Sequence, residues 1–351
     1  MTEEAIDAGL DERLVAYLRD LLQRPALEFL QPPAPVLGGF STLIYAFQLK
    51  GAPPDFSGRL IVRIFQNAES ARRAAGEAAL QNALADARFP VPRVVHVGTD
   101  PRPLGGVFTI MHRVEGRPLL DAALRPPTLL PRAPGLLART HARLHALDPS
   151  PVIQALERAD ASFRFSGTDA LLESLRREAQ APGLECMRPA LEWLEANRPR
   201  GVSRRAILHM DFHPGNVLVE GGRVAGVVDW ANLAVGDPAA DVGTTSVILT
   251  CGPLDLPWAL QWPADLLRRW FAWRYLAVYR AGRPISDATL QYYRALRCYS
   301  SMLHVGEIRV ARRTGAPVRS ETYAWGGPRQ VARMTRIFEQ VSGVPLVLPP
   351  E

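Results

Sequence analysis

The pattern of apolar and polar positions changes near residue 113, from mainly strand-like to mainly helical spacing. Leucines recur at helical intervals within residues 10–24, which predicts an amphipathic first helix. Compact apolar runs bounded by Pro and Gly then predict strands. An Ala-, Glu- and Arg-rich segment over residues 68–88 interrupts them and predicts a helix. The expected strands are 35–37, 42–49, 60–65, 94–97 and 107–111.

Beyond Gly116 the apolar positions recur mostly every three or four residues, as in helices that pack on a core. Helices are expected at 133–147, 169–179, 186–197, 238–250, 263–281, 286–313 and 328–341, with short strands at 206–208, 217–219 and 224–228. We therefore expect an α+β fold with two lobes. A small β-sheet-plus-helix lobe would cover residues 1–113, and a larger, mainly helical lobe residues 114–351.

Composition narrows the class of protein. With 47% hydrophobic and 22% charged residues, the 351-residue chain has the balance of an ordinary globular protein. Lys50 is the only lysine among 41 basic residues, so a Walker P-loop is excluded. The arginines are scattered, so we expect no nucleic-acid partner. No apolar run is long enough to span a bilayer and the acidic N-terminus does not resemble a secretory signal, so we expect a cytoplasmic protein without a membrane partner.

The densest polar cluster lies in the segment His209-Met-Asp-Phe-His-Pro-Gly-Asn216. Its Pro-Gly pair forbids a continued helix, so the cluster is expected in a loop between two strands. Asp211, Asn216 and the later Asp229 offer hard oxygen ligands, which suit Mg²⁺ together with substrate phosphates. One carboxylate then remains to contact an attacking hydroxyl.

The spacing H-x-D-x-x-x-x-N, followed by a strand and an Asp, resembles the catalytic loop of the protein-kinase-like fold. The fuller pattern L-H-M-D-F-H-P-G-N, V-V-D-W and G-D-P-A-A-D resembles the family of aminoglycoside phosphotransferases and choline kinase-like small-molecule kinases. The resemblance extends over most of the chain. Segment 37–41 is similar to the glycine-containing nucleotide loop of that family, 61–64 to its phosphate-contacting strand and 108–116 to its nucleotide hinge.

The resemblance implies a kinase that moves the γ-phosphate of ATP or GTP, with Mg²⁺, to a hydroxyl of a small molecule. It implies Asp211 as the catalytic base and Asn216 and Asp229 as the magnesium ligands. Asp237 and Asp241 would brace the catalytic loop. The residues implied to bind the nucleotide are Gly38, Gly39, Ser41, Arg63, Glu77, Met111 and Arg113.

Two positions depart from the family pattern. Arg63 stands where the family usually has the phosphate-contacting lysine, and Met210 stands where glycine or arginine is common. An arginine can still pair with phosphate oxygens and with Glu77 on the following helix. The missing lysine also leaves a second hypothesis open, namely a nucleotide-binding pseudokinase or regulatory scaffold without phosphotransfer. The sequence does not define the oligomeric state.

Other polar and aromatic groups have simpler interpretations. His209, Asp211 and His213 form an H-x-D-x-H pattern, but no second cluster completes a metal-hydrolase site. His145 is expected to be a hydrogen-bonded core histidine. The aromatic series at 258–279 is expected first of all in the helix core. Residues 250–351 contain 14 arginines against seven acids, which favours a neutral or anionic acceptor over a polycationic aminoglycoside.

Overall fold

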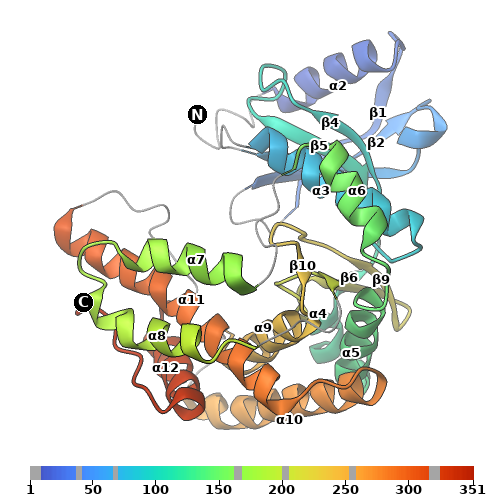
Figure 1. The fold of residues 1–351 in the computed structure, drawn as a ribbon. Helices are drawn as coiled ribbons and strands as arrows, with labels where there is room; N and C mark the ends of the chain where they lie inside the picture. Colours follow the sequence, from blue (N-terminus) through green and yellow to red (C-terminus); the bar gives the residue numbers. More distant parts are fainter. Residues whose placement is uncertain are drawn as a thin grey trace. The chain divides into compact units, whose positions relative to one another are not determined.

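The computed structural model describes residues 9–36, 42–65, 70–161, 168–199, 205–252, 258–315 and 325–351. The chain divides into two compact units, each of which is drawn in Figure 1. One comprises Met1–Arg117, Ser150–Phe163 and Leu218–Ala231, and the other Pro118–Pro149, Arg164–Val217 and Asn232–Glu351. Two segments distant in sequence thus join the first unit, and the lobe boundary expected after residue 113 stays a prediction.

The first unit is built on a five-stranded antiparallel sheet with the order β1-β2-β3-β5-β4. Leucines of the helix α2 pack on this sheet, as their spacing predicts. A second helix, α3, packs against α6, which arrives from the later segment and lies beside it in Figure 1. The elements are α2 (Leu10–Leu21), β1 (Glu28–Pro35), β2 (Thr42–Lys50), η1 (Pro54–Phe56), β3 (Arg59–Phe65), α3 (Ser70–Asp86), β4 (Val94–Gly98), β5 (Val107–His112) and α6 (Ser150–Arg158).

The first strand begins earlier than predicted. A strand was expected only at 35–37, because the prolines before it indicated a break, yet β1 spans Glu28–Pro35 and pairs with β2. Proline cannot donate to the strand ladder, but β1 lies at the edge of the sheet, where one side needs no partner. Two register shifts within β1 accommodate the irregular stretch.

The second unit is mainly helical. Its longest helices, α10 and α11, pack against α5 and α9 respectively, and α12 packs on α11. Its two-stranded sheet pairs β7 with β10. A three-stranded sheet with the order β6-β8-β9 lies mostly within the first unit, which contains residues 218–231. The elements from residue 117 onward are β6 (Arg117–Pro118), α4 (Leu119–Leu124), η2 (Pro127–Leu129), α5 (Ala133–Leu144), α7 (Thr168–Ala179), η3 (Glu185–Met187), α8 (Arg188–Ala196), β7 (Ala206–Leu208), β8 (Val217–Glu220), β9 (Arg223–Val227), β10 (Ala234–Gly236), α9 (Pro238–Cys251), α10 (Trp258–Gly282), α11 (Asp287–Thr314) and α12 (Pro328–Ser342).

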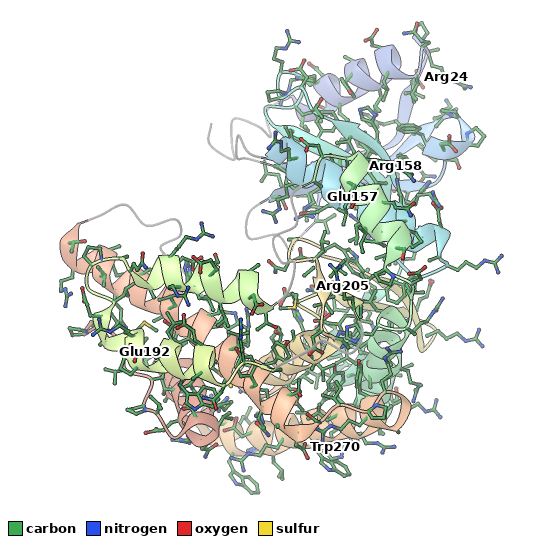
Figure 2. All side chains as sticks on the ribbon, in the orientation of Figure 1. Arg24, Glu157, Arg158, Glu192, Arg205 and Trp270 are labelled. Atoms are coloured by element: carbon green, nitrogen blue, oxygen red, sulfur yellow. The ribbon has the colours of Figure 1, made fainter. Side chains whose placement is uncertain are left out.

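Side-chain exposure corrects one expectation about α10. Tyr275 and Tyr279 are fully buried, as expected, but Trp262 and Trp273 are 76% and 62% exposed. A helix that packs through one face leaves the other in solvent, so the aromatic series cannot all be core. Arginines are spread over both units; Figure 2 labels Arg24 in the first and Arg205 in the second. No helix in the described part is long and apolar enough to cross a membrane.

Candidate active site

The segment His209–Asn216 forms the loop expected between two strands, here β7 and β8. Its own hydrogen bonds fix it: the Asn216 N–H donates to the His213 carbonyl at 2.9 Å, and the Gly215 N–H donates to His213 Nδ1 at 3.0 Å. The hydroxyl of Thr245 on α9 donates to the Phe212 carbonyl at 2.9 Å. Functional side chains on this loop are therefore held by a rigid backbone.

Asp211 and Asn216 come together within this loop. The Asn216 side-chain N–H donates to the backbone carbonyl of Asp211 at 3.0 Å and to its carboxylate at 3.4 Å. This arrangement orients the amide so that Asn216 Oδ1 is left as a possible cation ligand. The Asp211 side chain keeps 26% of its surface exposed, and His213 Nε2 lies 3.8 Å from its carboxylate. An accessible carboxylate on a fixed loop can accept a proton from a substrate hydroxyl.

Met210, the residue before Asp211, has a positive φ of 61°. This left-handed conformation costs a residue with a Cβ about 1–2 kcal/mol, which explains why glycine suits the position. Asp241 at the start of α9 opposes that cost, because its carboxylate accepts the Met210 N–H at 2.9 Å and the His209 N–H at 2.5 Å. The prediction that Asp241 braces the loop is confirmed. Asp237 instead caps α9 through the Ala239 N–H at 2.9 Å.

The Asp241 carboxylate also meets two buried histidines. The Nε2 atoms of His141 and His145 lie 3.0 and 3.2 Å from Asp241 Oδ2. Their Nδ1 atoms face the Tyr275 and Tyr279 hydroxyls at 2.7 and 2.6 Å. If each tyrosine donates to Nδ1, the His145 Nε2–H donates to the carboxylate, whereas His141 Nε2 lies close to the carboxylate without an aligned hydrogen bond. The core role expected for His145 is confirmed.

These three ligating side chains, His141, His145 and Asp241, could in principle hold a metal ion. The Asp241 carboxylate already accepts two backbone N–H groups, so this cluster is better explained as a support for the catalytic loop than as a metal site. Sequence reasoning missed His141 as a member of this network. The signal was present, since the histidines and the tyrosines both follow i,i+4 spacing on helices that pack together, α5 and α10.

Burial sets the charge states in this network. Burial and the neighbouring His141 lower the pKa of His145 from 6.5 to about 4. Burial by itself opposes ionisation of Asp241, but His141 and the hydrogen bonds from both histidines outweigh it and hold the pKa of Asp241 well below its usual range. The result is a buried carboxylate anion, and an anionic acceptor makes stronger hydrogen bonds to the backbone N–H groups of the loop than a neutral one.

We expect acid to destabilise the protein through His145. Its pKa is about 4 when folded and 6.5 otherwise, so between these values the unfolded chain binds more protons and stability falls as the pH falls. The charged neighbours of His145 are Asp241 and Arg283, with His141 beside it. Denaturant titrations at pH 7 and pH 5 give the free energy of unfolding at each pH. Its slope against pH should be steeper for the parent than for His145→Gln, by up to about 1.4 kcal/mol per pH unit. Equal slopes would contradict a buried neutral imidazole.

Asp229 belongs to the first unit and follows the strand β9. Its φ is +64°, and its side chain is exposed. The next residue, Trp230, is buried; its indole N–H donates to the Val227 carbonyl at 3.0 Å and its ring packs edge-on against Phe89. The anchored indole fixes the backbone that carries the Asp229 carboxylate. A positive φ at a residue with a Cβ is strained, and it persists only where the surrounding structure holds it in this way.

The expected ion pair between Arg63 on β3 and Glu77 on α3 is present at 2.7 Å. Arg63 Nε also donates to the Thr42 hydroxyl at 3.1 Å, and its guanidinium lies over the Phe65 ring. Glu77 is buried and receives a second arginine, Arg73, at 2.9 Å. Sequence reasoning missed Arg73, although its i,i+4 spacing to Glu77 was a usable signal.

Five other residues are expected to bind the nucleotide, and the structure describes two of them, Met111 and Arg113. Gly38, Gly39 and Ser41 lie outside the described residues. Met111 is buried near the end of β5 and pairs with β3 and β4. The Arg113 N–H donates to the Arg59 carbonyl at 2.9 Å, so it cannot also donate to a nucleotide. The roles of these residues stay predictions.

The antiparallel sheet with its paired Arg63 and Glu77, and the helical unit with its braced H-x-D-x-x-x-x-N loop, define the class of protein-kinase-like phosphotransferases. Comparison with known families agrees: the profile of the phosphotransferase enzyme family matches residues 34–281, and the chain belongs to that family.

Solved structures share the fold. One from Ralstonia eutropha JMP134, classed with the aminoglycoside phosphotransferases, is 20% identical with a TM-score of 0.66 and covers 95% of this chain and 98% of its own. A thermostable mutant of aminoglycoside phosphotransferase APH(4)-Ia, in complex with AMP-PNP and hygromycin B, is 16% identical with a TM-score of 0.62, covering 96% and 99%. The GDP complex of aminoglycoside 2'-phosphotransferase-IIIa is 17% identical with a TM-score of 0.56, covering 94% and 98%.

The curated proteins with similar sequences carry different names from these structures and are acyl-CoA dehydrogenase family members. Acyl-CoA dehydrogenase family member 11 of Gallus gallus is 29% identical over 170 residues, which is 46% of this chain and 21% of that protein. Acyl-CoA dehydrogenase family member 10 of Mus musculus is 29% identical over 175 residues, 46% and 15% respectively. The chain therefore spans about a fifth or less of the length of these relatives.

Proposed function

We propose that the protein transfers the γ-phosphate of ATP or GTP to a hydroxyl of a small, neutral or anionic acceptor. The observation that carries this proposal is the catalytic loop, in which Asn216 orients an accessible Asp211 and Asp241 fixes the backbone beside it. The AMP-PNP and GDP complexes of structures with the same fold support the use of a nucleotide.

In this mechanism Asp211 orients the acceptor hydroxyl and takes its proton as the new oxygen–phosphorus bond forms and the bond to the β-phosphate oxygen breaks. Asn216 Oδ1 and the Asp229 carboxylate are hard oxygen donors and fit Mg²⁺. Magnesium held there would neutralise charge on the phosphates. Arg63, already oriented by Glu77 and Thr42, would contact phosphate oxygens, while Met111 and Arg113 would flank the nucleotide base.

Two lines support an acceptor other than an aminoglycoside. The segment from residue 250 onward carries 14 arginines against seven acids, so a polycation would find few partners there. The curated relatives are named as acyl-CoA dehydrogenase family members, which favours a hydroxyacyl thioester as the acceptor. Such a molecule joins a reactive hydroxyl to an anionic nucleotide-like carrier.

A screen of acceptors tests the proposal directly. The purified protein with Mg²⁺ and ATP or GTP is offered hydroxyacyl-CoA thioesters, sugars and kanamycin-type aminoglycosides, and the added phosphate is detected by mass spectrometry. Phosphorylation of a neutral or anionic alcohol is the expected result. Activity on aminoglycosides alone would overturn the acceptor class. Nucleotide-induced thermal stabilisation with no turnover on any acceptor would favour the scaffold hypothesis instead.

Arg63→Ala should raise the nucleotide KM by roughly 10- to 150-fold, because it removes a charge-assisted contact worth about 1.5–3 kcal/mol. Arg63→Lys should retain partial activity, since an ammonium can replace the contact to Glu77 but not also that to Thr42. Arg72→Ala is the matched control, because its side chain is 76% exposed. Steady-state kinetics at varied nucleotide concentration measures the effect. An unchanged KM in Arg63→Ala would remove Arg63 from the nucleotide site.

A further inference from the structure

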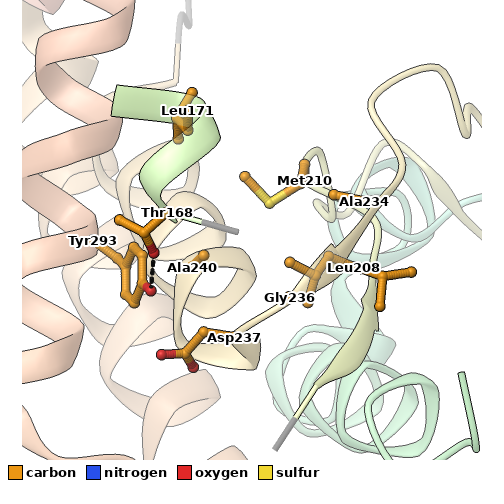
Figure 3. A pocket seen from close by; sticks show the side chains of 10 residues that line it. Thr168, Leu171, Leu208, Met210, Ala234, Gly236, Asp237, Ala240 and Tyr293 are labelled. Carbon is orange, nitrogen blue, oxygen red and sulfur yellow. Dashed lines mark hydrogen bonds between the residues drawn. The ribbon is translucent and has the colours of Figure 1, made fainter. Parts of the chain in front are cut away.

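A pocket within the second unit borders the catalytic loop on the side of Met210. Figure 3 shows its walls: Thr168 and Leu171 from α7 and Tyr293 from α11 lie across from Met210, with Ala240 of α9 between them. Leu208, Ala234, Val235 and Gly236 of the small β7–β10 sheet complete the lining, which also includes Asp237.

The lining is chemically simple. Most of the exposed surface in the pocket is apolar. The two hydroxyls present, on Thr168 and Tyr293, share one hydrogen bond at 2.7 Å, and Tyr293 also interacts with Asp237. Among the described residues that line the pocket, Asp237 is the one with a formal charge, and one of its oxygens already caps α9. A carboxylate or phosphate that entered here would face the like charge of Asp237, which is costly.

We infer that this pocket receives a short alkyl substituent of the acceptor, next to the hydroxyl that Asp211 activates. The inference rests on the proposed function and deepens it, because it names the shape of the acceptor beside the reacting carbon. Met210, which lines the pocket, directly precedes Asp211 in the loop, so an alkyl group on the hydroxyl-bearing carbon can enter the pocket while the hydroxyl contacts Asp211. The acceptor is thus an alcohol with an uncharged, aliphatic end at the hydroxyl-bearing carbon.

The size of the pocket limits that substituent. Its cavity volume is about 30 Å³, room for roughly two or three heavy atoms, since a single water needs about 10–15 Å³ on this measure. Each methylene added to the substituent and buried in the pocket contributes about 0.8 kcal/mol, so it should raise kcat/KM about fourfold. The gain should stop near propyl, because longer chains would have to displace Leu171 or Tyr293. Any charged carrier of the acceptor must lie at the other end of the molecule.

The first experiment measures kcat/KM for hydroxyacyl-CoA thioesters whose hydroxyl-bearing carbon carries hydrogen, methyl, ethyl, propyl or pentyl, and for one with a terminal carboxylate there. We expect a maximum at ethyl or propyl and at least a tenfold penalty for the carboxylate. Ala240→Leu should move the maximum to hydrogen or methyl, and Leu171→Ala should move it toward pentyl. Ala277→Leu, at an exposed position of α10, is the matched control and should keep the parental profile.

A second experiment does not depend on catalysis. The protein is labelled with ¹³C at its methionine methyl groups and studied by NMR. The resonance of Met210 is identified by its absence from the spectrum of Met210→Leu, and its chemical shift is followed during titration with 2-butanol. It should shift to saturation in the parent and in Ala277→Leu, and not in Ala240→Leu. An unresponsive Met210 methyl, or a chain-length profile that Ala240→Leu and Leu171→Ala leave unchanged, would overturn the inference. Absence of phosphate transfer with a responsive Met210 methyl would instead overturn the proposed function.

Discussion

Asp211→Asn should reduce kcat by roughly 100-fold or more, while the fold and the nucleotide KM stay nearly unchanged. The substitution keeps the shape of the side chain but removes the group that takes the proton from the acceptor. Asp211 is partly exposed and its backbone carbonyl, not only its carboxylate, receives the Asn216 amide, so the loop has little reason to rearrange. Phosphate transfer to an acceptor found in the screen, or slow magnesium-dependent nucleotide turnover without one, provides the assay.

Asp229→Ala is the informative comparison for that variant. It deletes a proposed metal ligand, so it should weaken magnesium-dependent nucleotide binding itself, which calorimetry with Mg²⁺ and a non-hydrolysable ATP analogue detects. Asp211→Asn should bind this analogue like the parent. If Asp211→Asn turned over within a few-fold of the parent, the base would have to be another residue, and unchanged metal dependence in Asp229→Ala would exclude that carboxylate as a ligand.

Asp241→Asn should have the largest effect on stability, with a loss of about 3–5 kcal/mol in the free energy of unfolding. Asparagine removes the negative charge and one acceptor oxygen, yet the N–H groups of His209 and Met210 still have to be satisfied in a buried place. Its side-chain amide would also bring N–H groups toward the two histidines. The positive φ of Met210 would then be less well supported, and Asp211 would lose its fixed position.

Denaturant unfolding and steady-state kinetics together separate the two consequences. Asp237→Asn is the matched control for stability, since asparagine caps a helix about as well as aspartate and the change should stay within about 0.5 kcal/mol. In Asp241→Asn, measured under conditions where it is folded, kcat should fall more than the nucleotide KM rises. A variant as stable and as active as the parent would show that the loop holds itself in place without Asp241.

The sequence by itself determined the fold class and the main chemical groups. Apolar spacing is local, so it located most helices and strands. The H-x-D-x-x-x-x-N pattern placed Asp211 and Asn216 on one loop because only four residues, two of them Pro and Gly, separate them. The Arg63 and Glu77 pair was also predictable, since a strand and the next helix pack together. Local irregularities were not predictable from the sequence. The proline-containing strand β1 is tolerated because it lies at the edge of its sheet, and the sequence does not show which strand will be at an edge.

Only the tertiary structure decided what surrounds the loop. His141, Asp241 and Tyr275 belong to three different helices, and their contacts exist because α5, α9 and α10 pack together. The bracing role of Asp241 followed from the family pattern, but the two histidines that meet its carboxylate could not be assigned from any one segment. The pocket beside Met210 has the same origin. Its walls come from separate helices and strands, whose side chains define a space only after the core has packed.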